Sequence, residues 1–120
     1  MPLLVKSRRT SLENLRKLAP DALILDVTSR GSEPWVSFSP FYPHGGIPVP
    51  FSPNYFSMTV EGIWQGLKVF ETTDVDSSKL LISNMKGIKR SARKYGKVLG
   101  HRAGFTGSQL LPYAEARSTI

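Results

Sequence analysis

The chain has 120 residues and a mass of 13.3 kDa, which leaves room for one domain and one hydrophobic core. Its 16 Lys and Arg outnumber its nine Asp and Glu, so the net charge is +7 and the pI is near 10.0. A positive surplus of this kind attracts anionic partners such as phosphates, nucleotides and nucleic acid. The alternative is that the lysines only keep a small domain in solution.

The composition also excludes several classes of protein. The sequence has no cysteine, so it forms neither a disulfide framework nor a thiolate metal site, and this fits a reducing cytosol. The two histidines, His44 and His101, are far apart in sequence, and we predict no metal site and no cofactor. The apolar stretches are too short for a signal peptide or a membrane span. We expect a soluble cytoplasmic protein with no membrane partner, and the oligomeric state stays open.

The first expected elements are a helix and two strands. Thr10–Glu13 has the pattern of a capping box, and the leucines that follow recur at helical spacing until Pro20 ends the helix. Ala22–Thr28 is a short apolar run that predicts a buried strand. After a turn, Trp35–Phe38 is the candidate for a second strand.

The segment from Pro34 to Pro53 is rich in proline and aromatic residues. It holds six of the nine prolines, which remove amide donors and disfavour helix, so we expect an ordered loop or a set of edge segments. Its aromatic side chains indicate that the loop packs against the domain. A long loop inside a compact domain is often functional.

The remainder of the chain is predicted to be mostly helical. The result is a helix-dominated α+β fold, with one compact domain over residues 1–120, a short N-terminal β element and the ordered Pro/aromatic loop. The expected helices run from Ser57 or Thr59 to about Glu71, from Asp76 to about Lys86, from about Ile88 to Tyr95, and from a start within Leu110–Ala116.

The helix that begins near Thr59 carries the main chemical signal. At 100° per residue, Glu61, Gln65 and Lys68 form a polar row directly beside the apolar stripe that is expected to be buried. Gly62 and Gly66 occupy a third face, where each glycine costs about 1 kcal/mol against alanine. Another backbone or a ligand is therefore expected to approach that face closely. The alternative is an ordinary solvated polar row.

The same region resembles the NADAR (YbiA-like) family of N-glycosidases. That family shows a short aromatic motif, (F/L)-S-N-F, and later a helix of the form (T/S)-x-E-x-x-x-Q-x-x-K. Residues 38–41, FSPF, are similar to the first motif, and residues 59–68, TVEGIWQGLK, match the second in identity and spacing. Pro40 replaces the motif's asparagine and no tryptophan follows Trp64, so the resemblance is to a divergent or truncated member with a YbiA-like domain.

The resemblance implies hydrolysis of the N-glycosidic bond of an ADP-ribosyl or ribosyl-phosphate group, including removal of ADP-ribose from a modified base or nucleic acid. Such cleavage passes through an oxocarbenium-like state, which needs a nearby carboxylate and a proton source for the leaving base. Glu61 is the expected carboxylate. Lys68 is expected either to clamp a phosphate or to attack the anomeric carbon as a Schiff-base nucleophile.

Further residues are expected to bind the ADP-ribosylated or phosphoribosylated ligand. Gln65 would orient a ribose hydroxyl, aromatic rings would stack on the base, and Arg102 lies in a glycine-rich segment suited to a diphosphate. The alternative for the aromatic residues is core packing. The candidates for substrate binding are Phe38, Phe41, Tyr42, Trp64, Gln65 and Arg102.

A dense run of cations between Lys86 and Arg102 supports other functions. It predicts a phosphate-binding edge or a nucleic-acid footprint, with a solvated basic helix as the alternative. The rival function is a non-catalytic module that binds a nucleotide, ADP-ribose or nucleic acid. A third is an interaction protein whose Pro/aromatic loop binds a partner.

Overall fold

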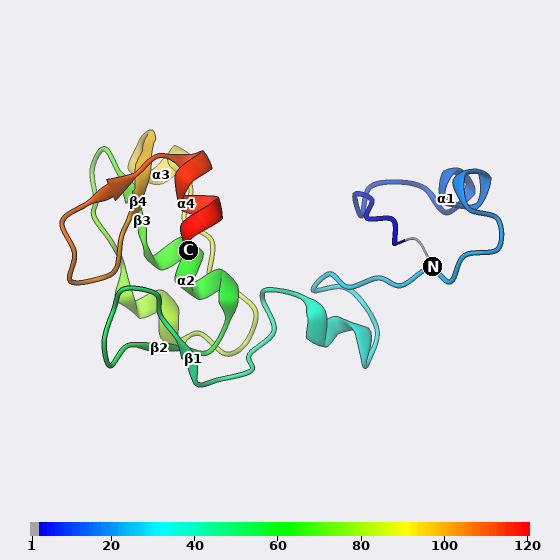
Figure 1. Ribbon diagram of the computed structural model, residues 1–120, viewed down its shortest axis with the longest axis horizontal. Coiled ribbons are helices and arrows are strands. Elements are labelled where there is room, and N and C mark those ends of the chain that lie inside the picture. Colours follow the sequence, from blue (N-terminus) through cyan, green and yellow to red (C-terminus); the bar gives the residue numbers. More distant parts are fainter. Residues whose placement is uncertain (1–2) are drawn as a thin grey trace. The chain divides into compact units, whose positions relative to one another are not determined.

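The structure is a computed structural model that describes residues 3–120 (Figure 1). The chain divides into two compact units, one ending at Ser39 and one comprising Pro40–Ile120. The expectation of one domain over residues 1–120 stays a prediction. No helix in the described part of the chain is both long enough and apolar enough to cross a membrane.

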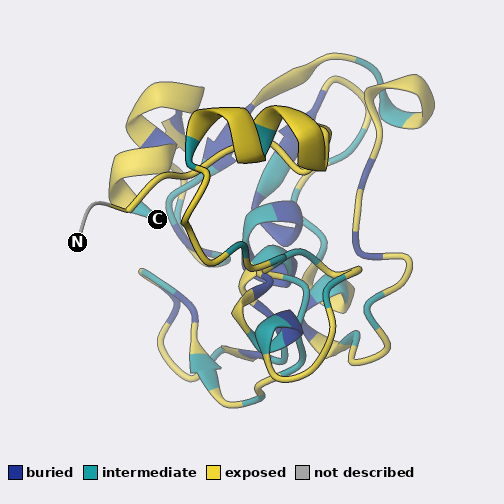
Figure 2. Cartoon of the chain, turned by 90° about the vertical axis from the view of Figure 1, so that its right-hand side faces the viewer, coloured by how far each residue is buried: buried dark blue, intermediate teal, exposed yellow. Residues whose placement is uncertain are grey.

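The N-terminal unit contains the predicted first helix but neither predicted strand. Helix α1, Leu12–Leu18, is capped by Ser11, whose side chain accepts a hydrogen bond from the Asn14 amide, so the predicted capping box that starts at Thr10 was wrong by one residue. Figure 2 shows the helix almost wholly exposed. The predicted strand at residues 22–28 was wrong, because the Asp26 carboxylate accepts bonds from the Thr28 amide and hydroxyl and closes a local turn.

The second predicted strand is a 3-10 helix, η1, Trp35–Phe38. It forms because backbone bonds run locally from the Val36 amide to the Ser32 carbonyl and from the Ser39 amide to the Val36 carbonyl. A strand would need a neighbouring strand to satisfy these groups, and within residues 3–39 the structure contains no strand.

The C-terminal unit contains two small antiparallel sheets, and in Figure 1 helix α2 runs through the middle of this unit. One sheet pairs β1 with β2, and the other has the strand order β3-β4-β5. The elements are β1 (Ile47–Pro48), β2 (Phe56–Ser57), α2 (Val60–Gly66), β3 (Lys68–Phe70), η2 (Ser77–Leu81), α3 (Ala92–Tyr95), β4 (Val98–Arg102), β5 (Leu110–Leu111) and α4 (Tyr113–Thr119).

Helix α2 begins where the sequence predicts and ends earlier. The Thr59 hydroxyl accepts a hydrogen bond from the Gly62 amide at 2.8 Å, as expected for an N-cap. The predicted extension to Glu71 was wrong, because Lys68 leaves the helix and pairs with His101 in the sheet. The short α2 is therefore followed directly by β3.

The prediction that Gly62 and Gly66 are close contacts is confirmed. A Cβ on Gly62 would lie 2.6 Å from the Lys79 carbonyl oxygen, which no real side chain tolerates. A Cβ on Gly66 would lie 3.0 Å from both the Asp76 carbonyl oxygen and the Phe105 ring. The glycines let η2 pack directly on the α2 backbone.

The prediction of a helix-dominated, YbiA-like fold was wrong, because helices account for only 29% of the structure and no feature specific to the YbiA fold is found. The segment expected to form helices between Asp76 and Tyr95 gives only η2 and the four-residue α3. Met85 and Gly87 adopt positive φ values of 64° and 71°, which interrupt a helix. The Arg90 amide donates a hydrogen bond to the side chain of Gln65, a residue distant in sequence, and not to a carbonyl within a local helix.

The core of the C-terminal unit forms around α2. Ile63 from α2 and Leu67, which directly follows α2, pack with Val49 from the Pro/aromatic segment and Leu80 from η2. The Ser52 hydroxyl also accepts a hydrogen bond from the Phe105 amide at 2.8 Å. The Pro/aromatic segment beyond Pro40 is therefore anchored to the core, as its composition predicts.

Candidate functional site

The predicted polar row exists as a chain of hydrogen bonds. The Gln65 amide nitrogen donates to the Glu61 carboxylate at 2.7 Å, and the Lys68 ammonium donates to the Gln65 amide oxygen at 3.1 Å. Gln65 is only 4% exposed, whereas Glu61 and Lys68 are half-buried. A buried amide thus holds a carboxylate and an ammonium group at the surface of α2.

Lys68 reaches this row from a different element than the sequence predicts. It is the first residue of β3, and its side chain turns back toward the last turn of α2 to reach Gln65. Burial lowers the pKa of Lys68, and the positive charges of Arg90 and Lys89 add to this effect, while the Glu61 carboxylate opposes it. The amine is therefore more readily deprotonated than an exposed lysine.

Phe41 and Lys89 adjoin the row. The Pro40 carbonyl accepts a hydrogen bond from the Glu61 amide at 2.8 Å, which brings the neighbouring Phe41 to the start of α2. The Lys89 ammonium lies 5.6 Å from the centroid of the Phe41 ring. The fold therefore places Phe41 next in sequence to the residue that contacts the start of α2, and an aromatic wall around Glu61 and Lys68 stays a prediction.

His101 of β4 lies next to Lys68 in the sheet and contacts Trp64 of α2. His101 is the cross-strand partner of Lys68, and its ring stacks under Trp64 with the centroids 3.8 Å apart. Burial lowers the pKa of His101 to about 4, and the charge of Lys68 adds to this effect. Among the described residues neither ring nitrogen forms a hydrogen bond, and His101 is 1% exposed. His101 is therefore neutral and holds Trp64 in place.

Arg90 is the residue whose role the sequence does not reveal. It belongs to the cationic run between Lys86 and Arg102, yet it is only 6% exposed and contacts the backbone of the elements that carry the site. Its guanidinium donates to the carbonyls of Gln65, Lys68 and Asp74 at 3.0, 2.7 and 2.6 Å. It thereby joins α2, β3 and the following loop. The only sequence signal is its position two residues after the buried Ile88.

Three predicted binding residues have contacts with residues outside the row. Phe38 belongs to the N-terminal unit, is exposed and stacks on Trp35 with ring centroids 6.3 Å apart. Tyr42 lies against His44 with centroids 4.9 Å apart. Arg102 donates to both carboxylate oxygens of Asp74, at 3.0 and 2.9 Å. Their roles in ligand binding stay predictions.

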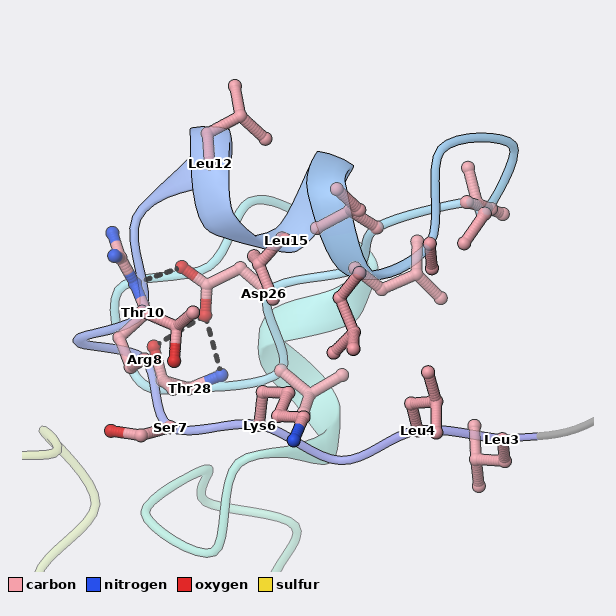
Figure 3. A pocket seen from close by; sticks show the side chains of 17 residues that line it. Leu3, Leu4, Lys6, Ser7, Arg8, Thr10, Leu12, Leu15, Asp26 and Thr28 are labelled. Atoms are coloured by element: carbon pink, nitrogen blue, oxygen red, sulfur yellow. Dashed lines mark hydrogen bonds and ion pairs between the residues drawn. The ribbon is translucent and has the colours of Figure 1, made fainter.

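The N-terminal unit contains a cavity of about 500 Å³ lined mostly by aliphatic side chains (Figure 3). Its carboxylate, Asp26, is bound to Arg8 at 2.7 Å and to the Thr28 amide at 3.0 Å. Because these polar groups satisfy one another, we place the candidate site on α2 and β3 and not in this cavity.

The chain matches the model of a protein family over residues 7–120, and it therefore belongs to that family, which is described as a family of unknown function (DUF6939). No curated protein and no solved structure matches the chain. The resemblance to the NADAR (YbiA-like) family was wrong, because the matching family is a different one. The residues that matched the NADAR helix motif have structural roles here. Thr59 caps α2, and the Gln65 side chain forms hydrogen bonds with Glu61 and Lys68.

Proposed function

We propose that the Pro40–Ile120 unit binds an anionic ligand that carries a phosphate and a planar base, as a nucleotide does. The observation that carries this proposal is the Lys89 ammonium 5.6 Å from the Phe41 ring centroid, together with Lys68, which Gln65 holds and whose charge interacts with that of Lys89. Residues 40–120 hold ten Lys and Arg against five Asp and Glu, so the unit as a whole attracts phosphate.

The groups of the row match the parts of a nucleotide. Lys68 and Lys89 repel one another, and a phosphate between them would relieve this repulsion. Glu61 accepts a hydrogen bond from Gln65, and its remaining lone pairs suit ribose hydroxyls. Phe41 offers a ring on which a base can stack.

Replacing Lys68 by glutamine should weaken AMP binding by about tenfold, because a charge-assisted bond to phosphate is lost. Lys89→Gln should have a similar effect. Isothermal titration calorimetry with AMP, ADP-ribose and adenosine measures this, and adenosine should bind weakly to all variants. Lys17→Gln removes the same charge from α1 and should leave AMP affinity unchanged. Equal binding of adenosine and AMP, or an unchanged affinity of Lys68→Gln, would contradict the proposal.

A second candidate function is hydrolysis of the N-glycosidic bond of an ADP-ribosyl or ribosyl-phosphate group. It is favoured by one specific observation: an amine of lowered pKa is joined through a single amide to a carboxylate. Water would attack the anomeric carbon, the bond to the base would break, and the base would leave with a proton. This candidate rests on Glu61, Gln65 and Lys68 alone.

If this second function holds, Glu61→Gln should lower the rate of base release by about a hundredfold or more while ADP-ribose still binds. The negative charge matters most when positive charge develops at the anomeric carbon, and glutamine keeps nearly the same shape. Chromatographic detection of free base from NAD and from ADP-ribosylated guanine measures the rate. Wild-type protein that binds ADP-ribose but releases no base from either substrate would leave only the binding function.

A further inference from the structure

We propose that the ligand of this site is single-stranded nucleic acid, and that α4 supplies a second stacking surface for it through Tyr113 and Arg117. This inference rests on the proposed function, which requires only one phosphate and one base. It adds a second base position and a second phosphate contact.

The second stacking surface stands beside Trp64. The Tyr113 ring meets Trp64 edge-on, with centroids 6.0 Å apart and planes at 72°, and Tyr113 is 62% exposed. The Arg117 guanidinium lies 5.6 Å from the centroid of the Tyr113 ring. The helix that carries both is anchored, because Ala116 is fully buried and Ile120 packs on the core. An exposed ring with an adjacent cation is therefore held on a fixed element.

This arrangement repeats the one at Phe41. Lys89 accompanies Phe41 as Arg117 accompanies Tyr113. Lys68 connects the two pairs: its charge interacts with that of Lys89, and its cross-strand partner His101 stacks on Trp64, which contacts Tyr113. Two rings, each with its own cation, match two consecutive nucleotides better than one.

The rings favour a single strand over a duplex. Bases in a duplex are stacked on one another, so their faces are not available to protein side chains, whereas an unpaired strand can place successive bases on aromatic rings. The Pro40–Ile120 unit exposes further cations that could contact phosphates, and one of them lies 5.2 Å from the Tyr95 ring centroid. The exposed members of this group are Lys86, Arg93, Lys94 and Lys97.

Fluorescence anisotropy with a labelled, mixed-sequence oligonucleotide of about 12 nucleotides tests the proposal. The single strand should bind more tightly than the duplex of the same sequence. Tyr113→Ala should weaken single-strand binding by about tenfold. Arg117→Gln should reduce the slope of log affinity against log salt by about 0.7, as measured between about 50 and 200 mM KCl.

Two matched controls test whether the loss of any exposed aromatic ring, or of any one positive charge, weakens oligonucleotide binding. Phe56→Ala removes an aromatic ring of similar exposure, 57%, from β2, and Lys17→Gln removes one charge from α1. Both should bind the oligonucleotide as the wild type does. Tyr113 and Arg117 are exposed, so circular dichroism should show that their variants fold normally.

The results distinguish failure of this inference from failure of the proposed function. Duplex binding as tight as single-strand binding, or no effect of Tyr113→Ala, would overturn the second stacking surface. AMP binding that still depends on Lys68 would then leave the proposed function standing. If neither AMP nor the oligonucleotide depends on Lys68, both are wrong.

Discussion

Acid should destabilise this protein by about 3 kcal/mol through His101 alone, between about pH 6.5 and pH 4. The pKa of His101 is lowered from 6.5 to about 4 by burial, with Lys68 adding to the effect. In that pH range the unfolded chain binds a proton that the folded chain does not, so the free energy of unfolding falls as the pH falls. Below about pH 4 both states hold the proton and this loss ends.

Urea denaturation at several pH values, followed by circular dichroism, measures this loss. His101→Phe keeps a ring against Trp64 but cannot bind a proton, so the stability difference between the wild type and this variant should shrink by about 3 kcal/mol as the pH falls from 7 to 4. His44→Phe replaces the exposed histidine, and this variant should lose as much free energy of unfolding in acid as the wild type does. Parallel curves for the wild type and His101→Phe would show that His101 titrates near its ordinary pKa in the folded protein.

Arg90→Met should lower the free energy of unfolding by about 3 kcal/mol or more. The substitution removes the donor to three backbone carbonyls that lie at the junction of α2, β3 and the following loop. It also removes a cation that lies 4.8 Å from the Phe70 ring centroid and 5.6 Å from that of Tyr95. Because the side chain is almost fully buried, water cannot readily replace these bonds.

Arg90→Lys should not restore the stability, since an ammonium group cannot reproduce the planar fork of a guanidinium. Arg93→Met, which removes an exposed arginine three residues later, should change the free energy of unfolding by only about 0.5 kcal/mol. Urea denaturation at neutral pH compares the three variants. A loss at Arg90→Met no greater than that at Arg93→Met would mean that the buried guanidinium does not hold the junction together.

The features of the site that the sequence predicted are those set by residues close together in the chain. Thr59 starts α2 because its hydroxyl satisfies the Gly62 amide three residues later. Glu61 and Gln65 meet because residues four apart lie on the same helix face. The two glycines indicated a close contact because glycine is costly in a helix without one.

The features that the sequence could not predict depend on segments far apart in the chain. Lys68 is at a helical spacing from Gln65, yet it belongs to a strand because residues 98–102 lie beside it. In the sequence, Arg90 cannot be distinguished from the other cations of its run. Its burial depends on the distant segments that supply carbonyls to its guanidinium. The motif that resembled another family predicted neither the strand at Lys68 nor the burial of Arg90.

The sequence alone determined the helix at Leu12–Leu18, the start of α2 and the pairing of Glu61 with Gln65, because caps and i to i+4 contacts need only neighbouring residues. The tertiary structure decided the rest. It ended α2 at Gly66 and buried His101 under Trp64, and it placed Lys89 against Phe41. A strand needs a partner to satisfy its backbone groups, and a side chain becomes buried only when distant segments cover it.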